Sequence, residues 1–254
     1  MKLLSLFDLT NKIALVTGGG SGLGHAIAIG IAKAGANVAV VTNSSPAQAT
    51  MEAIQALGRD ALSIQADLSV ESQLSEVTAK VLERFGRIDI LINNAGIIRR
   101  KPAAEHEAKD WHDVLSVNLD AVFFLCQLAG REMIKQGSGK IINIASMLSY
   151  QGGVNVPGYT ASKHAVAGVT KALANEWASK GIQVNAIAPG YMITDNTTQL
   201  RQDPVRNGQI LERIPAGRWG LPEDLVGPVV MLASAASDYM NGHILCVDGG
   251  WQAR

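Results

Sequence analysis

Short runs of apolar and β-branched residues alternate with longer helical patterns along the chain, and this alternation constrains the fold more than any other feature. Residues 13–17 and 88–93 are apolar at most positions, which is typical of strands buried on both faces of a parallel sheet. Consecutive parallel strands are joined by right-handed crossover helices. The alternation therefore predicts an α/β fold, with a doubly wound parallel sheet and helices on both faces.

The pattern predicts a single seven-stranded sheet of the Rossmann type. Its strands are expected at residues 13–17, 37–42, 61–66, 88–93, 140–145, 183–188 and 243–247. The helical patterns between them cover residues 22–34, 46–57, 70–85, 105–136, 157–179 and 222–235. Because no repeat, low-complexity tract or Pro/Ser linker divides the chain, residues 1–254 are expected to form one domain.

Residues 190–221 interrupt the alternation between the sixth strand and the last helix. They carry Pro204, Pro215, Gly217 and Gly220, which favour turns. A long irregular insertion in a compact domain is usually a lid or a binding loop. We therefore interpret residues 190–221 as the substrate lid.

Composition excludes several classes of protein. The 22 Lys and Arg residues balance 22 Asp and Glu residues and form no basic stripe, so a nucleic-acid partner is not expected. No apolar run approaches the roughly 18 residues of a membrane span, and the chain does not begin like a secretory leader. We therefore expect a cytoplasmic protein without a membrane partner.

Cys126 and Cys246 both lie in apolar runs, where inert core packing is expected. The five histidines are scattered, so no metal site is expected.

A glycine-rich loop follows the first strand and leads into a helix, with the sequence Thr17-Gly-Gly-Gly-Ser-Gly-Leu-Gly24. Glycine allows a sharp turn and lets the backbone approach a pyrophosphate closely. The helix that follows offers free N–H groups and a partial positive charge at its N-terminus. The spacing of Gly18, Gly22 and Gly24 differs from G-x-G-x-x-G, but its place between strand and helix still predicts a dinucleotide site.

Further motifs occur at the ends of the predicted strands. Asn93-Asn-Ala-Gly96 closes the fourth strand, Ser146 follows the fifth, Tyr159-Thr-Ala-Ser-Lys163 opens the next helix, and Pro189-Gly190 ends the sixth strand. Together with the glycine loop, these motifs resemble the short-chain dehydrogenase/reductase family over essentially the whole chain. The resemblance implies an enzyme that transfers hydride between a nicotinamide cofactor and a secondary alcohol or ketone.

Tyr159 and Lys163 have the spacing of a catalytic pair. Four residues apart on a helix, they lie on the same face. A nearby ammonium is expected to lower the pKa of the tyrosine and so make it a better base. Ser146 follows a strand at the edge where open α/β sheets bind ligands, and its hydroxyl could hold the substrate oxygen. By resemblance, Asn118 sustains a water relay and Lys163 also holds the nicotinamide ribose.

The resemblance also implies a set of cofactor contacts. Asp67 would hydrogen-bond the adenine, although Asp67 or Ser69 could equally cap the helix at 70–85. Asn94, Ala95 and Gly96 would line the adenine-ribose side, and Met192 and Thr194 would hold the carboxamide. The full set expected to bind cofactor is Gly18, Ser21, Gly22, Leu23, Gly24, Asn43, Asp67, Leu68, Asn94, Ala95, Gly96, Tyr159, Lys163, Pro189, Gly190, Met192 and Thr194.

The choice between NAD and NADP rests on the end of the second strand. No acidic residue is present there to bond the ribose 2′-hydroxyl, and no Arg or Lys is present to bind a 2′-phosphate. The resemblance favours NAD. Thr42, Asn43, Ser44 and Ser45 could still donate hydrogen bonds to a phosphate, so NADP is not excluded.

Longer stretches, such as Ile214-Pro-Ala-Gly-Arg-Trp-Gly220, resemble family members that act on deoxy-sugar acids in uronate and pectin breakdown. The alternatives are a reductase of 3-oxoacyl thioesters, an enzyme acting on another polyol, and a non-catalytic dinucleotide-binding sensor. A sensor would not require Asn118, Ser146, Tyr159 and Lys163 together. The substrate contacts are expected to be Ser146, Gln151, Tyr159 and Arg100, and the other arginines considered for the substrate carboxylate are Arg99, Arg213, Arg218 and Arg254.

The family is typically homotetrameric, through two long helices and the last strand. Here those helices carry apolar stripes at residues 122–125 and at Val166, Val169 and Leu173. The same stripes could instead face the chain's own sheet, as helix stripes usually do. A homotetramer is the expectation.

Overall fold

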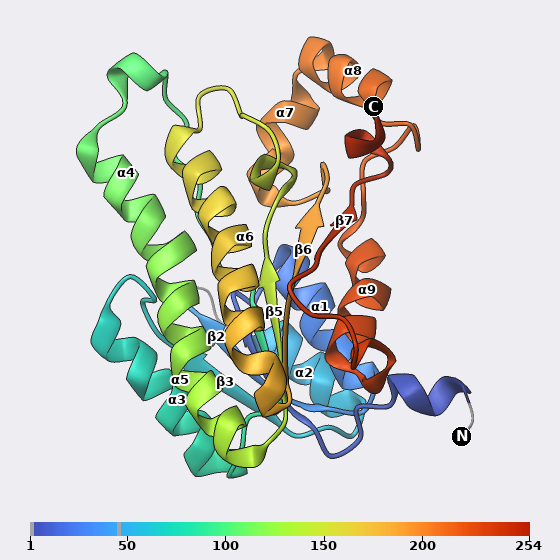
Figure 1. Cartoon of the computed structure of the whole chain (residues 1–254). Helices are drawn as coiled ribbons and strands as arrows, with labels where there is room; N and C mark the ends of the chain where they lie inside the picture. Colours follow the sequence, from blue (N-terminus) through green and yellow to red (C-terminus); the bar gives the residue numbers. More distant parts are fainter. Residues whose placement is uncertain (1–2, 45–46) are drawn as a thin grey trace.

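The computed structural model describes residues 3–44 and 47–254 (Figure 1). Seven strands form one parallel sheet in the order β3-β2-β1-β4-β5-β6-β7, which confirms the predicted doubly wound architecture. The strands are β1 (Ile13–Thr17), β2 (Asn37–Thr42), β3 (Ala61–Gln65), β4 (Ile90–Asn93), β5 (Gly139–Ile144), β6 (Ile182–Pro189) and β7 (Ile244–Val247). Each lies within two residues of its predicted bounds.

Helices cover both faces of the sheet. Those between the strands are α1 (Gly22–Lys33), α2 (Gln48–Ala56), α3 (Glu71–Phe85), α4 (Ala108–Leu115), α5 (Ala121–Gln136), α6 (Pro157–Trp177) and α9 (Val226–Ala233). Apolar residues of α3, α5 and α6 pack on one face, and those of α1, α2 and α9 pack on the other. The helix predicted at 46–57 starts within the described residues at Gln48, whereas position 46 lies outside them.

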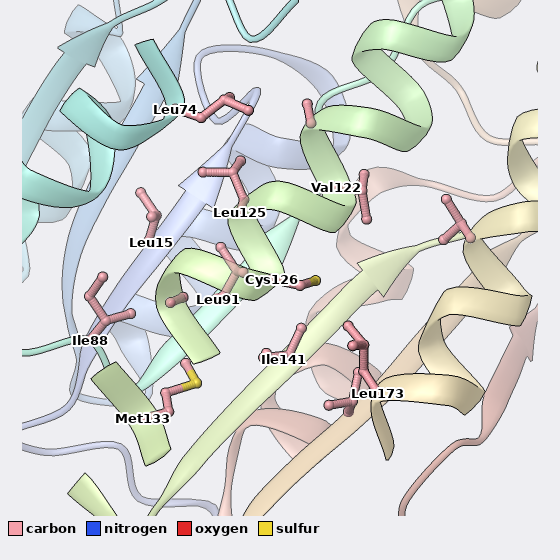
Figure 2. Packing of buried hydrophobic residues seen from close by; sticks show 14 of the residues in the cluster. Leu15, Leu74, Ile88, Leu91, Val122, Leu125, Cys126, Met133, Ile141 and Leu173 are labelled. Atoms are coloured by element: carbon pink, nitrogen blue, oxygen red, sulfur yellow. The ribbon is translucent and has the colours of Figure 1, made fainter. Parts of the chain in front are cut away.

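The larger core lies between the sheet and α5 (Figure 2). Leu15, Leu91 and Ile141 project from three neighbouring strands toward Leu125 and Met133 of α5. All five side chains are at most 1% exposed. The continuous apolar strands are thus buried on both faces, as the sequence predicts.

The two cysteines differ in environment. Cys126 is buried in this core, as predicted. Cys246 is exposed, so the prediction of core packing was wrong for it. The reason is that β7 is the edge strand of the sheet and lacks a covering neighbour on one side.

The long helix predicted at 105–136 begins later and is interrupted. Residues Ala103–Glu105 form a separate 3-10 turn, and a π-helical turn at Ser116–Asp120 joins α4 to α5. The combined helix Ala108–Gln136 is long and apolar enough to cross a membrane by length and composition, and among the described residues it is the one that passes this test. In the fold, its apolar side packs on the sheet: Val122, Leu125 and Cys126 are buried.

Residues 190–221 are only partly irregular, which corrects the prediction. They contain α7 (Thr198–Gln202) and α8 (Pro204–Arg213), which lie beyond the carboxyl ends of β6 and β7 (Figure 1). The Asp203 carboxylate accepts hydrogen bonds from the N–H groups of Val205 and Arg206, and Pro204 occupies the first helical position. An Asp-Pro pair is a recognised helix start, so the sequence did carry this signal.

Candidate active site

The glycine loop between β1 and α1 forms a tight cradle. Gly18 has a φ of 64°, a conformation that favours glycine. A Cβ atom at Gly24 would collide with the Gly18 carbonyl group and with Nδ2 of Asn94. Asn94 also fixes the loop, because its Nδ2 donates to the carbonyl oxygens of Thr17 at 3.0 Å and Gly18 at 3.2 Å. Only glycine therefore fits at position 24.

A cavity of about 410 Å³ lies beside this loop at the carboxyl ends of the strands. Most residues predicted to bind cofactor line it: Gly18, Ser21, Gly22, Leu23, Gly24, Asn43, Asp67, Leu68, Asn94, Ala95, Gly96, Tyr159, Lys163 and Thr194. Three do not. Gly190 and Met192 line a separate cavity of about 220 Å³, and Pro189 lines neither. The cradle and the cavity fit a dinucleotide, because they present backbone N–H groups at a helix N-terminus to a site that no side chain fills.

Sequence reasoning missed part of the cavity wall. Ile97, Ile98 and Val117 lie on one side, and Asp195 and Asn196 close it from the segment after β6. Asp195 and Asn196 belong to a 3-10 turn that begins after Thr194, where Thr194 and Thr197 form a reciprocal capping box. The capping residues were visible in the sequence, but their position over the cavity depends on the path of the chain.

The cavity also contains Asp67 and the end of β2. Asp67 Oδ1 accepts hydrogen bonds from the N–H and hydroxyl groups of Ser69, at 2.9 and 2.7 Å. No side chain caps the start of α3, so the alternative that Asp67 or Ser69 caps this helix was wrong. Thr42 and Asn43 line the cavity, whereas Ser45 lies outside the described residues.

Ser146, Tyr159 and Lys163 come together beside the cavity. Ser146 follows β5, and its hydroxyl accepts a hydrogen bond from the N–H of Leu148 at 3.1 Å. Tyr159 lies in the first turn of α6, and its phenol hydrogen-bonds the Ser146 side chain. Lys163 lies one turn later, and its Nζ is 5.6 Å from the centroid of the Tyr159 ring.

Burial controls the protonation of this pair. It lowers the pKa of Lys163 to about 8, because this residue is only 4% exposed and its ammonium is desolvated. Nζ of Lys163 donates to the carbonyl oxygen of Ile144 at 2.6 Å. Burial also raises the pKa of Tyr159, opposed by the hydrogen bond from Ser146 and the charge of Arg100. The prediction that the tyrosine pKa is lowered was therefore wrong, because desolvation outweighs the hydrogen bond from Ser146 and the charge of Arg100.

Asn118 lies in the π-helical turn and does not line the cavity. Its fully buried amide binds the loop after β4: Oδ1 accepts from the N–H of Ile97 at 2.8 Å, and Nδ2 donates to the Ile97 carbonyl at 2.9 Å. Nδ2 also donates to Oγ of Ser162 at 3.3 Å. Asn118 thus fixes one wall of the cavity against α6. Local π-helical turns frequently occur at functional sites.

The arginines considered for substrate have different partners. Arg99 pairs with Asp110 and Asp113, and Arg218 pairs with Asp224. Arg100 donates to the carbonyl of Asn196 at 3.2 Å, which links the loop after β4 to the cavity wall. The last two arginines, Arg213 and Arg254, lie together with Gln151. Arg213 donates to Oε1 of Gln151 at 3.3 Å, and Arg254 donates to the backbone carbonyl of Arg213.

No group of three or more His, Cys, Asp or Glu side chains within residues 3–44 and 47–254 could hold a metal ion. The chemistry of the site rests on a hydroxyl, a phenol, an ammonium and a nucleotide-sized cavity. This set can move a proton to or from an oxygen next to a bound dinucleotide.

Comparisons with known proteins agree with this geometry. The profile of the short chain dehydrogenase family matches residues 12–205. The chain belongs to this family. A 2-dehydro-3-deoxy-D-gluconate 5-dehydrogenase from Dickeya dadantii is 56% identical over 99% of this chain and 100% of its own length.

Two solved structures of the family illustrate the match. One, from Agrobacterium tumefaciens with bound NADP, is 51% identical with a TM-score of 0.92, over 98% of this chain and 99% of that one. The other is a gluconate 5-dehydrogenase from Burkholderia cenocepacia in complex with NADP and tartrate. It is 40% identical with a TM-score of 0.95, over 99% of both chains. As a short-chain dehydrogenase, this protein is a nicotinamide-dependent oxidoreductase.

Proposed function

We propose that this short-chain dehydrogenase interconverts a secondary alcohol and a ketone on a deoxy-sugar acid, of the 2-dehydro-3-deoxy-D-gluconate or 2-deoxy-D-gluconate type, in uronate breakdown. The observation that carries the proposal is the cluster of Ser146, Tyr159 and Lys163 beside a dinucleotide-sized cavity. The full-length match to the enzyme from Dickeya dadantii supports the sugar acid over a thioester or a neutral polyol.

Tyr159 is the proposed acid and base. In oxidation its phenolate accepts the proton of the substrate hydroxyl, while the bound nicotinamide supplies the hydride acceptor. In reduction the phenol donates that proton to the carbonyl oxygen. Because burial raises the pKa of Tyr159, the phenol form prevails near neutral pH. Oxidation is therefore expected to accelerate with rising pH.

The other catalytic residues support this transfer. Ser146 would hold the reacting oxygen, since its hydroxyl already bonds the phenol of Tyr159. Lys163 would bind the nicotinamide ribose and favour the phenolate through its charge. Asn118 would sustain the water relay from its buried place behind the cavity wall.

The cofactor would lie along the cavity. The N–H groups at the start of α1, with Gly18, Gly22 and Gly24, would bind the pyrophosphate. Asp67 and Asn94 would contact the adenosine half. The nicotinamide carboxamide would meet the chain after β6, at Met192 and Thr194, and this contact would bring Pro189 and Gly190 close to the cofactor.

We further propose that the enzyme accepts both NAD and NADP. Thr42 and Asn43 line the cavity where β2 ends, and they present neither a repelling carboxylate nor a cation to a 2′-phosphate. NADP is bound in the related structures from Agrobacterium tumefaciens and Burkholderia cenocepacia. Both observations support the use of NADP alongside NAD.

Arg100 and Gln151 are the proposed substrate contacts besides Ser146 and Tyr159. Arg100 is close enough for its charge to lower the pKa of Tyr159, so it would meet substrate oxygens near the reacting carbon. Gln151 follows the turn after Ser146 and would bond a sugar hydroxyl. The related gluconate 5-dehydrogenase binds tartrate, a hydroxy acid with two carboxylates, which supports an acid substrate here.

Residues 190–221 are the proposed substrate lid of a single domain, since Asp195 and Asn196 already close one side of the cavity.

A homotetramer in the cytoplasm is the proposed working form. Val122, Leu125, Val166 and Leu173 pack in the chain's own core, as the alternative interpretation of these stripes requires. Phe123 remains 36% exposed on α5. Light scattering at the mass of one 26.8 kDa chain would contradict the tetramer.

A substrate panel tests the main proposal. The absorbance of reduced nicotinamide is followed with a deoxy-sugar acid, a neutral polyol and a 3-oxoacyl thioester, each with both cofactors. We expect the highest kcat/KM with the sugar acid. If the thioester or the polyol is turned over best, the sugar-acid assignment is wrong. Binding of nicotinamide without turnover of any substrate would instead indicate a sensor.

A further inference from the structure

The last residues of the chain lie against α8, close to the end of that helix (Figure 1). Nε of Arg254 donates to the carbonyl of Arg213 at 3.1 Å, and a terminal nitrogen donates to the carbonyl of Glu212 at 2.5 Å. These carbonyls belong to the last turn of α8, where helix carbonyls lack partners within the helix and the dipole favours a cation. The Arg254 side chain therefore caps α8 and fixes the position of its last residue.

The guanidinium of that last residue, Arg213, lies over an aromatic ring. It lies 4.0 Å from the centroid of the Trp251 ring, which is itself 5% exposed and packed on Tyr191 with ring centroids 4.8 Å apart. One of its five N–H groups bonds Oε1 of Gln151 at 3.3 Å. Among the described residues, Arg213 has no carboxylate within ion-pair distance. Its remaining donors are available to a ligand.

This guanidinium is linked to the segment that carries the catalytic serine. Its partner Gln151 donates its backbone N–H to the carbonyl of Met147 at 3.3 Å, and Met147 is the residue after Ser146. Nε2 of Gln252 donates to the same carbonyl at 3.3 Å, which ties the C-terminal turn to this point. Arg213 is thus tied through Gln151 to the loop that presents Ser146, and it does not line the cavity beside the glycine loop.

We propose that Arg213 binds the carboxylate of the substrate, with Trp251 and Arg254 as the positioning residues that hold it. The proposal rests on the sugar-acid function proposed above. In 2-dehydro-3-deoxy-D-gluconate, the substrate in the name of the Dickeya dadantii relative, the reacting carbon is C5 and the carboxylate is C1, toward the other end of the molecule. Arg100 would contact the reacting end and Arg213 the acid end.

The other arginines around the site are less suited to this role. Arg99 and Arg218 are already paired with aspartates, and Arg254 is bonded to the backbone of α8. A planar guanidinium binds a carboxylate through two parallel hydrogen bonds. Because Arg213 is already stacked on an indole ring, little side-chain freedom is lost when it binds.

Arg213→Gln tests the proposal with a matched pair of substrates. The pair is 2-dehydro-3-deoxy-D-gluconate and its primary amide, which has a similar shape but no charge. We expect the KM for the acid to rise about 10- to 100-fold, the loss of a charged hydrogen-bonded pair. The KM for the amide and the Kd of the cofactor should stay within twofold. Arg206→Gln is the control, because Arg206 lies on the same helix and its side chain bonds Gln209 within that helix.

Arg254→Ala tests the positioning role. We expect a smaller rise in the acid KM with unchanged kcat, and rescue by Arg254→Lys, whose ammonium can donate to the same two carbonyls. A residue that only stabilises the fold would lower the Tm without changing the ratio of acid to amide KM. That result would contradict positioning by Arg254.

The outcomes separate this inference from the function on which it rests. If the unaltered enzyme turns over the acid and Arg213→Gln leaves its KM unchanged, or raises both KM values equally, Arg213 does not bind the carboxylate. The sugar-acid function then stands. If the unaltered enzyme turns over neither compound, both proposals fail.

Discussion

Replacing Lys163 by methionine should remove a folding penalty whose size depends on pH. The Lys163 side chain is 4% exposed, and desolvation lowers its pKa from 10.5 to about 8. Between these two values the unfolded chain binds more protons at this residue than the folded chain does. The contribution of Lys163 to stability therefore rises with pH across that window and is least favourable below pH 8.

The magnitude follows from the same two values. A lowering from 10.5 to about 8 corresponds to a penalty of about 3 kcal/mol when the ammonium is fully charged. At pH 9.5 the folded Lys163 is mostly neutral, so about 2 kcal/mol of that penalty is gone. Methionine leaves the carbonyl of Ile144 without its donor, but this cost is the same at both pH values and cancels in the comparison.

Urea unfolding followed by tryptophan fluorescence, at one protein concentration, measures the effect. The substitution Lys163→Met changes the free energy of unfolding relative to the unaltered protein. This change should be about 2 kcal/mol more stabilising at pH 7 than at pH 9.5. Lys171→Met, on the exposed side of the same helix, is the control and should show the same difference at both pH values. An equal difference for Lys163→Met at pH 7 and pH 9.5 would refute the desolvation argument.

Three further variants test the site. Tyr159→Phe should lower kcat by about 10²- to 10⁴-fold with the cofactor Kd nearly unchanged, because only the proton-transfer group is removed; near-normal turnover would exclude Tyr159 as the acid and base. Gly24→Ala should raise the cofactor Kd at least tenfold by calorimetry, since its Cβ would displace the Gly18 backbone. Gly208→Ala, where a Cβ meets nothing within 4 Å, is its control and should bind cofactor normally. Asn43→Asp should lower kcat/KM with NADP at least tenfold relative to NAD, through repulsion of the 2′-phosphate at the cavity wall; the uncharged variant Asn43→Ser should not, and equal loss with both cofactors would place the 2′-phosphate elsewhere.

The positions of the strands and of the glycine loop could be predicted because their signals are local. An apolar run such as residues 13–17 specifies a buried strand within a few residues, and the spacing of Gly18, Gly22 and Gly24 specifies a turn into a helix. The Asp203-Pro204 helix start was equally local, and attention to it would have predicted α8. Sequence by itself thus determined the order of elements, the edge of the sheet that carries the site and the residue types gathered there.

Tertiary structure alone decided burial and charge partners. The exposure of Cys246 depends on β7 being the sheet edge, and the raised pKa of Tyr159 depends on how completely its surroundings exclude water. Arg100 meets Asn196 across 96 positions of sequence, and Arg213 meets Gln151 across 62. Desolvation and Coulomb interactions depend on distances in space, which no pattern of neighbouring residues encodes.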